Sequence, residues 1–214
     1  MSLRREVYLE AASEMAKATL YVAKFCDLNL PVAEHEAIAR NFGAAMSKLQ
    51  MVAGIATLTK AIEANSHFAS LNFELNQLRL SLLLDQKNIE FMQKSVEADI
   101  AQQKSLVTRI GQLQTENPKH PEIVALAKTF QELDSRIHET QQTRSELNDR
   151  TMTRHLDLCK IVFKRTRSFA EKLIELSIAL RKELDFDLKE DAESYKNIAR
   201  QSLEQAAGEM ETFI

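Results

Sequence analysis

The chain has 214 residues, of which 44% are hydrophobic and 28% are charged, and its formal net charge is −3. Only 4 glycines and 3 prolines are present, so few turns can be built, and good helix formers dominate the remaining composition. These properties predict an elongated all-α protein, and a net charge so near neutrality gives no support for nucleic-acid binding.

Residues 3–64 are predicted to form the N-terminal helices. Apolar residues recur at steps of three and four from Leu3 to Phe25, which gives one helical stripe. The stripe ends at "DLNLP", and Pro31 suits the first turn of a following helix. We expect that second helix to run to about residue 64, with a kink or short turn at "EANSHF", residues 63–68.

The second long helix is predicted over residues 66–116. Its apolar residues alternate at spacings of three and four, which keeps one seam facing a partner helix. Polar residues interrupt that seam near Asp85, Asp99 and Gln103. We therefore expect matching polar groups on the helix that packs against it.

Pro118 and Pro121 mark the point where the chain reverses. Proline has no N–H to donate to a helical hydrogen bond, and it disfavours helical conformation at the residue before it. The connection around these prolines is short, so we expect the helices on either side of it to lie antiparallel to each other. A third long helix is predicted over residues 120–187, followed by an acidic helix over residues 189–214. Folding about Lys119 places Asp85 opposite Arg154, and we predict an ion pair there that fixes the register. The same rule places Asp99 opposite residues 139–140.

One two-helix arm cannot bury all the apolar surface of this chain. Residues 3–64 supply further helices, which predicts a three-helix coiled coil at the end away from the prolines. The apolar residues in the middle of such a slender arm would still be exposed to solvent, so we expect a homodimer that combines helices from both chains.

A candidate membrane-contact surface lies in the third long helix. Lys160, Lys164 and Arg167 follow i, i+4, i+7 spacing and therefore share one helical face. Near an anionic bilayer each such group contributes about 1 kcal/mol. Lys104, Arg109 and Lys119, before and at the reversal, are further candidates. The alternative interpretation is that these side chains pair with acidic residues of the same bundle.

The sequence gives no support for catalysis, a cofactor or a metal site. The two cysteines, Cys26 and Cys159, form neither a disulfide framework nor a CxxC pair, which fits a reducing compartment such as the cytoplasm. The histidines lack metal-binding spacing, and neither a phosphate-binding glycine loop nor a recognisable catalytic triad occurs. No apolar run reaches the length of a membrane span. We therefore predict a protein that is not an enzyme.

The stretch "KNIEFMQKSVEADIAQQKSLVTRIGQLQTENPKHPEIVALAKTF" resembles the BAR domain superfamily and is most similar to the fungal eisosome core-component family. The similarity continues through "LCKIVFKRTRSFAEKLIELSIALRKELD" and covers residues 87–185. It implies a single BAR-like domain over residues 1–214 that forms a crescent-shaped homodimer and binds and bends membranes. One departure is that "IAQQKSLVTR" replaces the basic cluster that the family carries before the tip.

Three functions are compatible with this sequence. The first is a peripheral membrane protein at the cytoplasmic face that senses or stabilises curvature on anionic phospholipid. The second is a long-helix adaptor that binds protein partners without lipid, which the missing basic cluster favours. The third is a subunit of a helical pore-forming toxin, against which the polar tip "TENPKHPE" argues.

Overall fold

The computed structural model describes residues 2–184 together with residues 197 and 201, and every element in that part of the chain is helical. The elements are α1 (Ser2–Ala23), the short 3₁₀ helix η1 (Lys24–Cys26), α2 (Val32–Val52), α3 (Ile55–Glu116) and α4 (Glu122–Glu183). The prediction of an all-α protein is confirmed for these residues. The predicted acidic helix over residues 189–214 lies outside the described residues, apart from Asn197 and Gln201, which are helical.

The chain divides into two compact units. Among the described residues, unit 1 comprises those up to Leu80 together with those from His155 onward, and unit 2 comprises Ser81–Arg154. Unit 1 therefore contains α1, α2, the first part of α3 and the last part of α4, whereas unit 2 contains the rest of α3 and α4. The expected single domain and crescent-shaped homodimer stay predictions.

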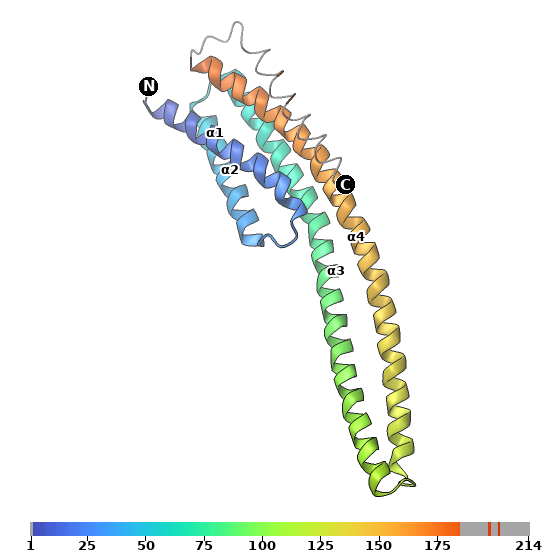
Figure 1. Ribbon diagram of the computed structural model, residues 1–214. Coiled ribbons are helices and arrows are strands. Elements are labelled where there is room, and N and C mark those ends of the chain that lie inside the picture. The colour runs from blue at the N-terminus through green and yellow to red at the C-terminus, as the bar shows by residue number, and fades with distance from the viewer. Residues whose placement is uncertain (1, 185–196, 198–200, 202–214) are drawn as a thin grey trace. The chain divides into compact units, whose positions relative to one another are not determined.

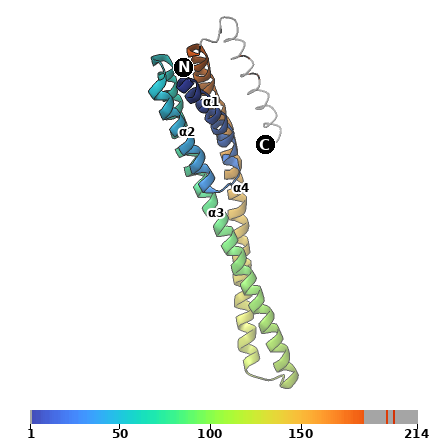
Figure 2. The same cartoon turned by 90° about the vertical axis from the view of Figure 1, so that its left-hand side faces the viewer.

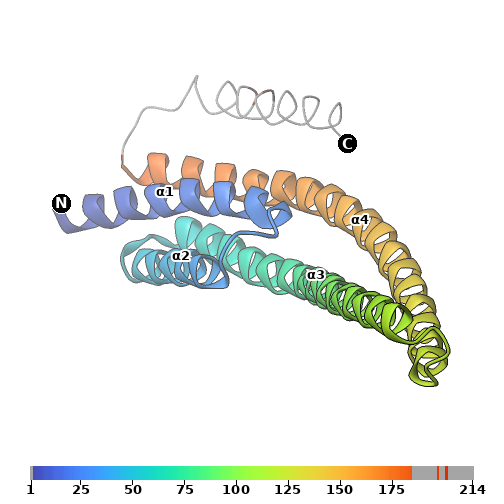
Figure 3. The same ribbon diagram turned by 60° about the horizontal axis from the view of Figure 1, so that its bottom comes forward.

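Unit 1 is a bundle of four helical segments. α1 runs beside α4, and α2 runs beside α3 (Figure 3). The centre of the bundle is aromatic, because the rings of Phe42, Phe68 and Phe169 lie 4.5–5.9 Å apart and all three are at most 4% exposed. Tyr21 extends the cluster from α1, and its hydroxyl donates to Oδ1 of Asn72 at 2.7 Å. Burial of these large side chains is the main stabilising term of the unit.

The connection between α1 and α2 is held by a buried arginine. Arg79 of α3 is 2% exposed, and its Nη2 donates to the carbonyl oxygens of Leu30 at 2.5 Å, Asp27 at 3.1 Å and Leu28 at 3.2 Å. These carbonyls follow the end of η1 and have few other partners, so the guanidinium satisfies them. Arg79 thereby fixes where the chain turns from α1 into α2.

The expected break at residues 63–68 is wrong. α3 passes through this stretch without interruption, because Ala61, Ala64, Phe68 and Leu71 lie on its buried face. The break lies earlier, at Ala53 and Gly54, so α2 ends at Val52 and not near residue 64. The predicted three-helix bundle consequently becomes four helical segments.

A carboxylate explains why the chain breaks at Gly54. Glu183, at the end of α4, accepts the Gly54 N–H with Oε1 at 2.9 Å and Oε2 at 3.1 Å. It also accepts the Tyr8 hydroxyl and pairs with Arg4, both on α1. Burial raises the pKa of Glu183, but these hydrogen bonds and the Arg4 charge outweigh burial and hold it below its ordinary value. One side chain thus joins three segments of unit 1.

Unit 2 is an antiparallel pair of helices. α3 and α4 run side by side up to the connection at residues 117–121 (Figure 1; Figure 2). The predicted reversal at the two prolines is confirmed, since the Asn117 N–H bonds the Leu113 carbonyl at 2.8 Å and the His120 N–H bonds the Asn117 carbonyl at 2.9 Å. The buried apolar side chains of this unit are Leu82, Val96, Leu113, Leu133 and Ile137.

Candidate functional site

The predicted pair between Asp85 and Arg154 is present in unit 2. Nη1 of Arg154 bonds Oδ2 of Asp85, and Nη2 donates to the Ser81 hydroxyl at 2.5 Å. The side chains are 19% exposed for Asp85 and 36% exposed for Arg154, so the pair is partly hydrated. A partly hydrated pair contributes little net stability, and its effect is to favour one register of α3 against α4.

A second pair in the same seam was missed by sequence reasoning. Arg136 holds the Asp99 carboxylate with two hydrogen bonds, and its Nε lies 2.7 Å from Oδ2. The hydrogen bond and charge of Arg136 lower the pKa of Asp99, against a smaller opposing effect of burial. The register rule placed Asp99 opposite residues 139–140, about one turn away. Arg136 lies one turn before these residues on the same face of the helix, and as a basic residue it could have been predicted as the partner of Asp99.

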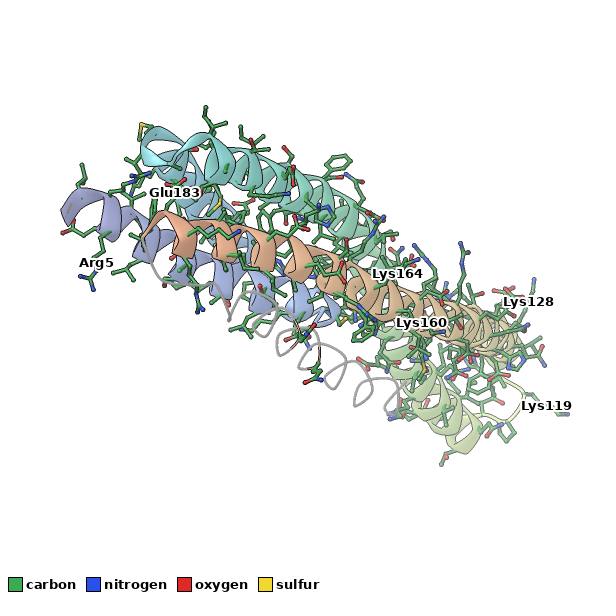
Figure 4. All side chains as sticks on the ribbon, turned by 90° about the horizontal axis from the view of Figure 1, so that it is seen from above. Arg5, Lys119, Lys128, Lys160, Lys164 and Glu183 are labelled. Atoms are coloured by element: carbon green, nitrogen blue, oxygen red, sulfur yellow. The ribbon has the colours of Figure 1, made fainter. Side chains whose placement is uncertain are left out.

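The candidate basic residues of unit 2 are all exposed. Arg109 pairs with Glu122 across the two helices at 3.5 Å, with the side chains 50% and 42% exposed. Lys119 lies in the connection itself, where its N–H bonds Oδ1 of Asn117 at 3.1 Å (Figure 4). Neither Lys104 nor Lys119 forms an ion pair within the described part of the chain. These three cations do not form a cluster held by the fold.

The basic stripe, which we define as Lys160, Lys164 and Arg167, lies exposed on α4 in unit 1. Lys160 and Lys164 project as neighbours from this helix (Figure 4). Lys160 lies 3.7 Å from Asp157, and Arg167 lies 3.8 Å from Glu171. Lys164 pairs with no acid among the described residues. Two acids thus offset part of the charge of the stripe, as the alternative interpretation expected.

A second surface of unit 1 was not predicted. We define the α3 face as the exposed residues of α3 between its start and the end of the unit, all of which the structure describes. They are Ile55, Ala56, Thr59, Ile62, Ser66, Ala69, Ser70, Phe73, Gln77, Leu78 and Leu80. Not one of them is charged. The largest are strongly exposed: Ile55 84%, Phe73 69%, Leu80 54% and Ile62 47%.

The charged side chains of α3 in this unit are engaged elsewhere. Lys60 lies 2.9 Å from Glu175 of α4, and Glu74 lies 2.9 Å from Arg165 of α4. Glu63 is shared between Lys60 at 3.0 Å and Lys172 at 3.8 Å. Because these ion pairs join α3 to α4, the α3 face is left with apolar and small neutral side chains. The sequence signal was the recurrence of large apolar residues at Ile55, Ile62, Phe73 and Leu80, off the buried stripe.

A groove of about 470 Å³ lies between α3 and α4 at the end of unit 1. Its polar lining includes Lys60, Glu175 and Glu183, which are already paired with protein groups. Few polar groups are therefore left in the groove to orient a small ligand, and it is a weak candidate for a binding site.

The two cysteines meet in unit 1. Cys26 and Cys159 are free thiols, and the Cys159 side chain influences the titration of Cys26. Burial, followed by the contact with Cys159, raises the pKa of Cys26 to about 12. Because the thiolate is the reactive form, a thiol that stays protonated at neutral pH is a poor nucleophile. Cys26 therefore lends no support to a catalytic role.

Two further features are absent from the described residues. None of the described helices combines the length and the apolarity needed to cross a bilayer. Groups of three or more His, Cys, Asp or Glu side chains placed to hold a metal ion are likewise absent from this part of the chain.

Comparison with known proteins adds no relative. Neither the protein-family models, nor the curated proteins, nor the solved structures gave a match to this chain.

Proposed function

We propose that this protein is a non-enzymatic helical scaffold that docks another protein chain on the α3 face. The observation that carries the proposal is the absence of charge from every exposed residue of α3 between Ile55 and Leu80, within the described structure. Surface helices normally place Lys, Glu, Arg and Asp on their solvent side. Seven turns without one such residue resemble the centre of an interface, from which charged side chains are depleted.

The apolar side chains on this face support the same function. A single exposed leucine is unremarkable, but Ile62, Phe73 and Leu80 follow one line along the helix and are 47–69% exposed. An apolar helical stripe of this kind is the pattern by which one helix packs against another. An aromatic residue such as Phe73 is the type of side chain that carries most of the binding energy at interfaces.

A photo-crosslinking amino acid placed at position 73 tests this proposal. The matched control is position 91, because Phe91 is also an exposed phenylalanine of α3, 74% against 69%, but lies in unit 2 among charged residues. After irradiation in an extract of source cells, we expect protein adducts at position 73 well above those at position 91. Equal adducts at both positions would reject the α3 face as a docking surface.

A second candidate function is peripheral membrane binding through the basic stripe. The observation that favours it is Lys164, which is exposed on α4 and forms no ion pair with a described residue, in line with Lys160 and Arg167. Each basic group near an anionic leaflet contributes about 1 kcal/mol, and Asp157 and Glu171 reduce that sum. This function would place the protein peripherally at the cytoplasmic face of a membrane, as the BAR-like resemblance implies.

Vesicle cosedimentation separates the two functions. Vesicles of phosphatidylcholine, with and without phosphatidylserine, are mixed with the full chain and with the triple variant Lys160→Glu, Lys164→Glu, Arg167→Glu. Membrane binding predicts sedimentation only with phosphatidylserine, and its loss in the triple variant. The control reverses three other exposed cations, Arg5, Arg40 and Lys128. Equal sedimentation with and without phosphatidylserine would show that the basic stripe does not bind membranes. Equal loss of sedimentation in both triple variants would show the same.

A further inference from the structure

We propose that the occupant of the α3 face is a second copy of this chain, with the two α3 helices antiparallel and a two-fold axis passing between Ser66 and Ala69. This inference rests on the proposed docking function of the same face and names its partner. It is drawn from the order of side chains along α3 in unit 1 and from their charges.

Six residues of the α3 face, including its most exposed apolar side chains, follow a palindromic order. A two-fold axis between positions 66 and 69 places Ile55 opposite Leu80, Ile62 opposite Phe73, and Ser66 opposite Ala69. In these three pairs a large apolar residue meets a large apolar residue of the other copy and a small one meets a small one, whereas Leu78 lies opposite the buried Thr57. Residue i contacts j while j contacts i, which is the defining property of a two-fold interface.

The small residues occupy the position where the two helices would approach most closely. Ser66, Ala69 and Ser70 are all exposed and lie at the centre of the face. Small side chains at the crossing let two helix backbones come near each other, while larger side chains on either side fill the space beyond. A face built to receive an unrelated partner has no need for this symmetry about its own centre.

Charge distribution favours the same partner. In a two-fold contact each residue near the axis lies close to its own copy, so a charged residue there would repel itself. Of the charged residues of α3 in this unit, Lys60, Glu63 and Glu74 pair with residues of α4, and Arg79 is buried against the connection between α1 and α2. The axis region is thus free of like-charge contacts.

The size of the face sets the expected affinity. From Ile55 to Leu80 the helix rises by about 38 Å, and a strip about 10 Å wide gives roughly 400 Å² per copy. The total of about 800 Å² is at the level of weak, transient complexes. We therefore expect a dimer with a dissociation constant in the micromolar range or weaker.

Sedimentation equilibrium of the full chain, from about 1 µM to about 200 µM, tests the partner. We expect the mass to rise from monomer towards dimer over this range. Phe73→Glu should keep the chain monomeric at every concentration, because the new carboxylate would lie against Ile62 of the other copy. Phe91→Glu, in unit 2, should dimerise like the parent. Circular dichroism checks that both variants keep their helix content.

Disulfide trapping tests the antiparallel arrangement. In a background of Cys26→Ser and Cys159→Ser, the variants Ile55→Cys and Leu80→Cys are prepared separately and oxidised with a copper–phenanthroline catalyst and air. An equimolar mixture should form the cross-linked dimer, whereas each variant alone should not, because like positions lie about 38 Å apart along an antiparallel pair. Trapping of each variant with itself would indicate parallel packing and overturn the axis.

The failure of this inference is distinguishable from the failure of the proposed function. A parent chain that stays monomeric at every concentration rules out the second copy as the occupant. Equal loss of the dimer in the Phe73→Glu and Phe91→Glu variants rules it out as well. If the adducts at position 73 then contain a different protein, the docking function stands without self-association. If position 73 gives adducts no stronger than position 91, both proposals fail.

Discussion

Unit 1 and unit 2 share α3 and α4 but are stabilised in different ways. In unit 1 the helices bury rings of Phe42, Phe68 and Phe169, and the exposed side of α3 is uncharged. In unit 2 two helices bury a narrow line of aliphatic residues, and the exposed residues of α3 include Lys87, Glu90, Lys94 and Glu97. Helix surfaces that face water usually carry charge along their length, and the lack of it on this stretch is the ground on which we propose that unit 1 docks another chain there.

The polar residues differ between the units as well. In unit 2 the ion pairs of Asp85 with Arg154 and Asp99 with Arg136 lie within the seam and align α3 with α4. In unit 1 the buried Arg79 and the half-buried Glu183 instead hold chain ends and connections. A two-helix seam lacks the apolar layers that would otherwise distinguish one register from another, so polar pairs take that role.

The largest difference in stability between the two units is expected when an aromatic side chain is truncated to alanine. Phe169→Ala should lower the free energy of unfolding by about 3–5 kcal/mol, because Phe169 is 0% exposed and its ring contacts those of Phe42 and Phe68. The same change at the exposed Phe91 of unit 2 should cost less than about 0.5 kcal/mol. Urea titration followed by circular dichroism measures both. Equal losses at the two positions would contradict an aromatic core confined to unit 1.

A smaller loss is expected at the break between α2 and α3. A Cβ on residue 54 would lie 2.8 Å from Oε1 of Glu183, so Gly54→Ala should displace the carboxylate from its N–H and from Tyr8. Losing charge-assisted hydrogen bonds of this kind costs about 1.5–3 kcal/mol.

A double-mutant cycle with Glu183→Gln isolates this contact. If the carboxylate is the group displaced, the two changes together should destabilise the protein by clearly less than the sum of the single changes. Strict additivity would show that Gly54 and Glu183 act independently, and the account of the break given above would be wrong.

The smallest expected effects concern the pH dependence of stability, which also differs between the two units. Burial, and then the charge of Arg79, lower the pKa of His35 in unit 1 to about 4, whereas an unfolded histidine titrates near 6.5. The unfolded chain therefore binds the extra proton between pH 6.5 and 4, and stability should fall as the pH falls through that window. In unit 2 the lowered pKa of Asp99 gives stability that is present above its unfolded pKa and lost at more acid pH.

Two substitutions test which residue causes the change in stability in each pH range. His35→Leu should flatten the stability curve between pH 6.5 and 4, and Asp99→Asn should flatten it only below about pH 4. An NMR titration of the His35 ring measures its pKa directly. A midpoint near 6.5 would show that His35 is hydrated in the folded protein and not packed against Tyr21 and Phe25.

The sequence by itself determined the helical class, the reversal at Pro118 and Pro121, and the opposition of Asp85 and Arg154. Each of these depends on local chemistry or on a constant rise per residue, so counting along the chain is enough. Only the tertiary structure decided that the helix breaks at Gly54 and not at residues 63–68, because Glu183, 129 residues away, accepts the Gly54 N–H. It also decided that Asp99 meets Arg136, and that Ile62, Phe73 and Leu80 lie outside the bundle. Which side of a long apolar helix is buried depends on where its neighbours pack, and periodicity alone does not contain that information.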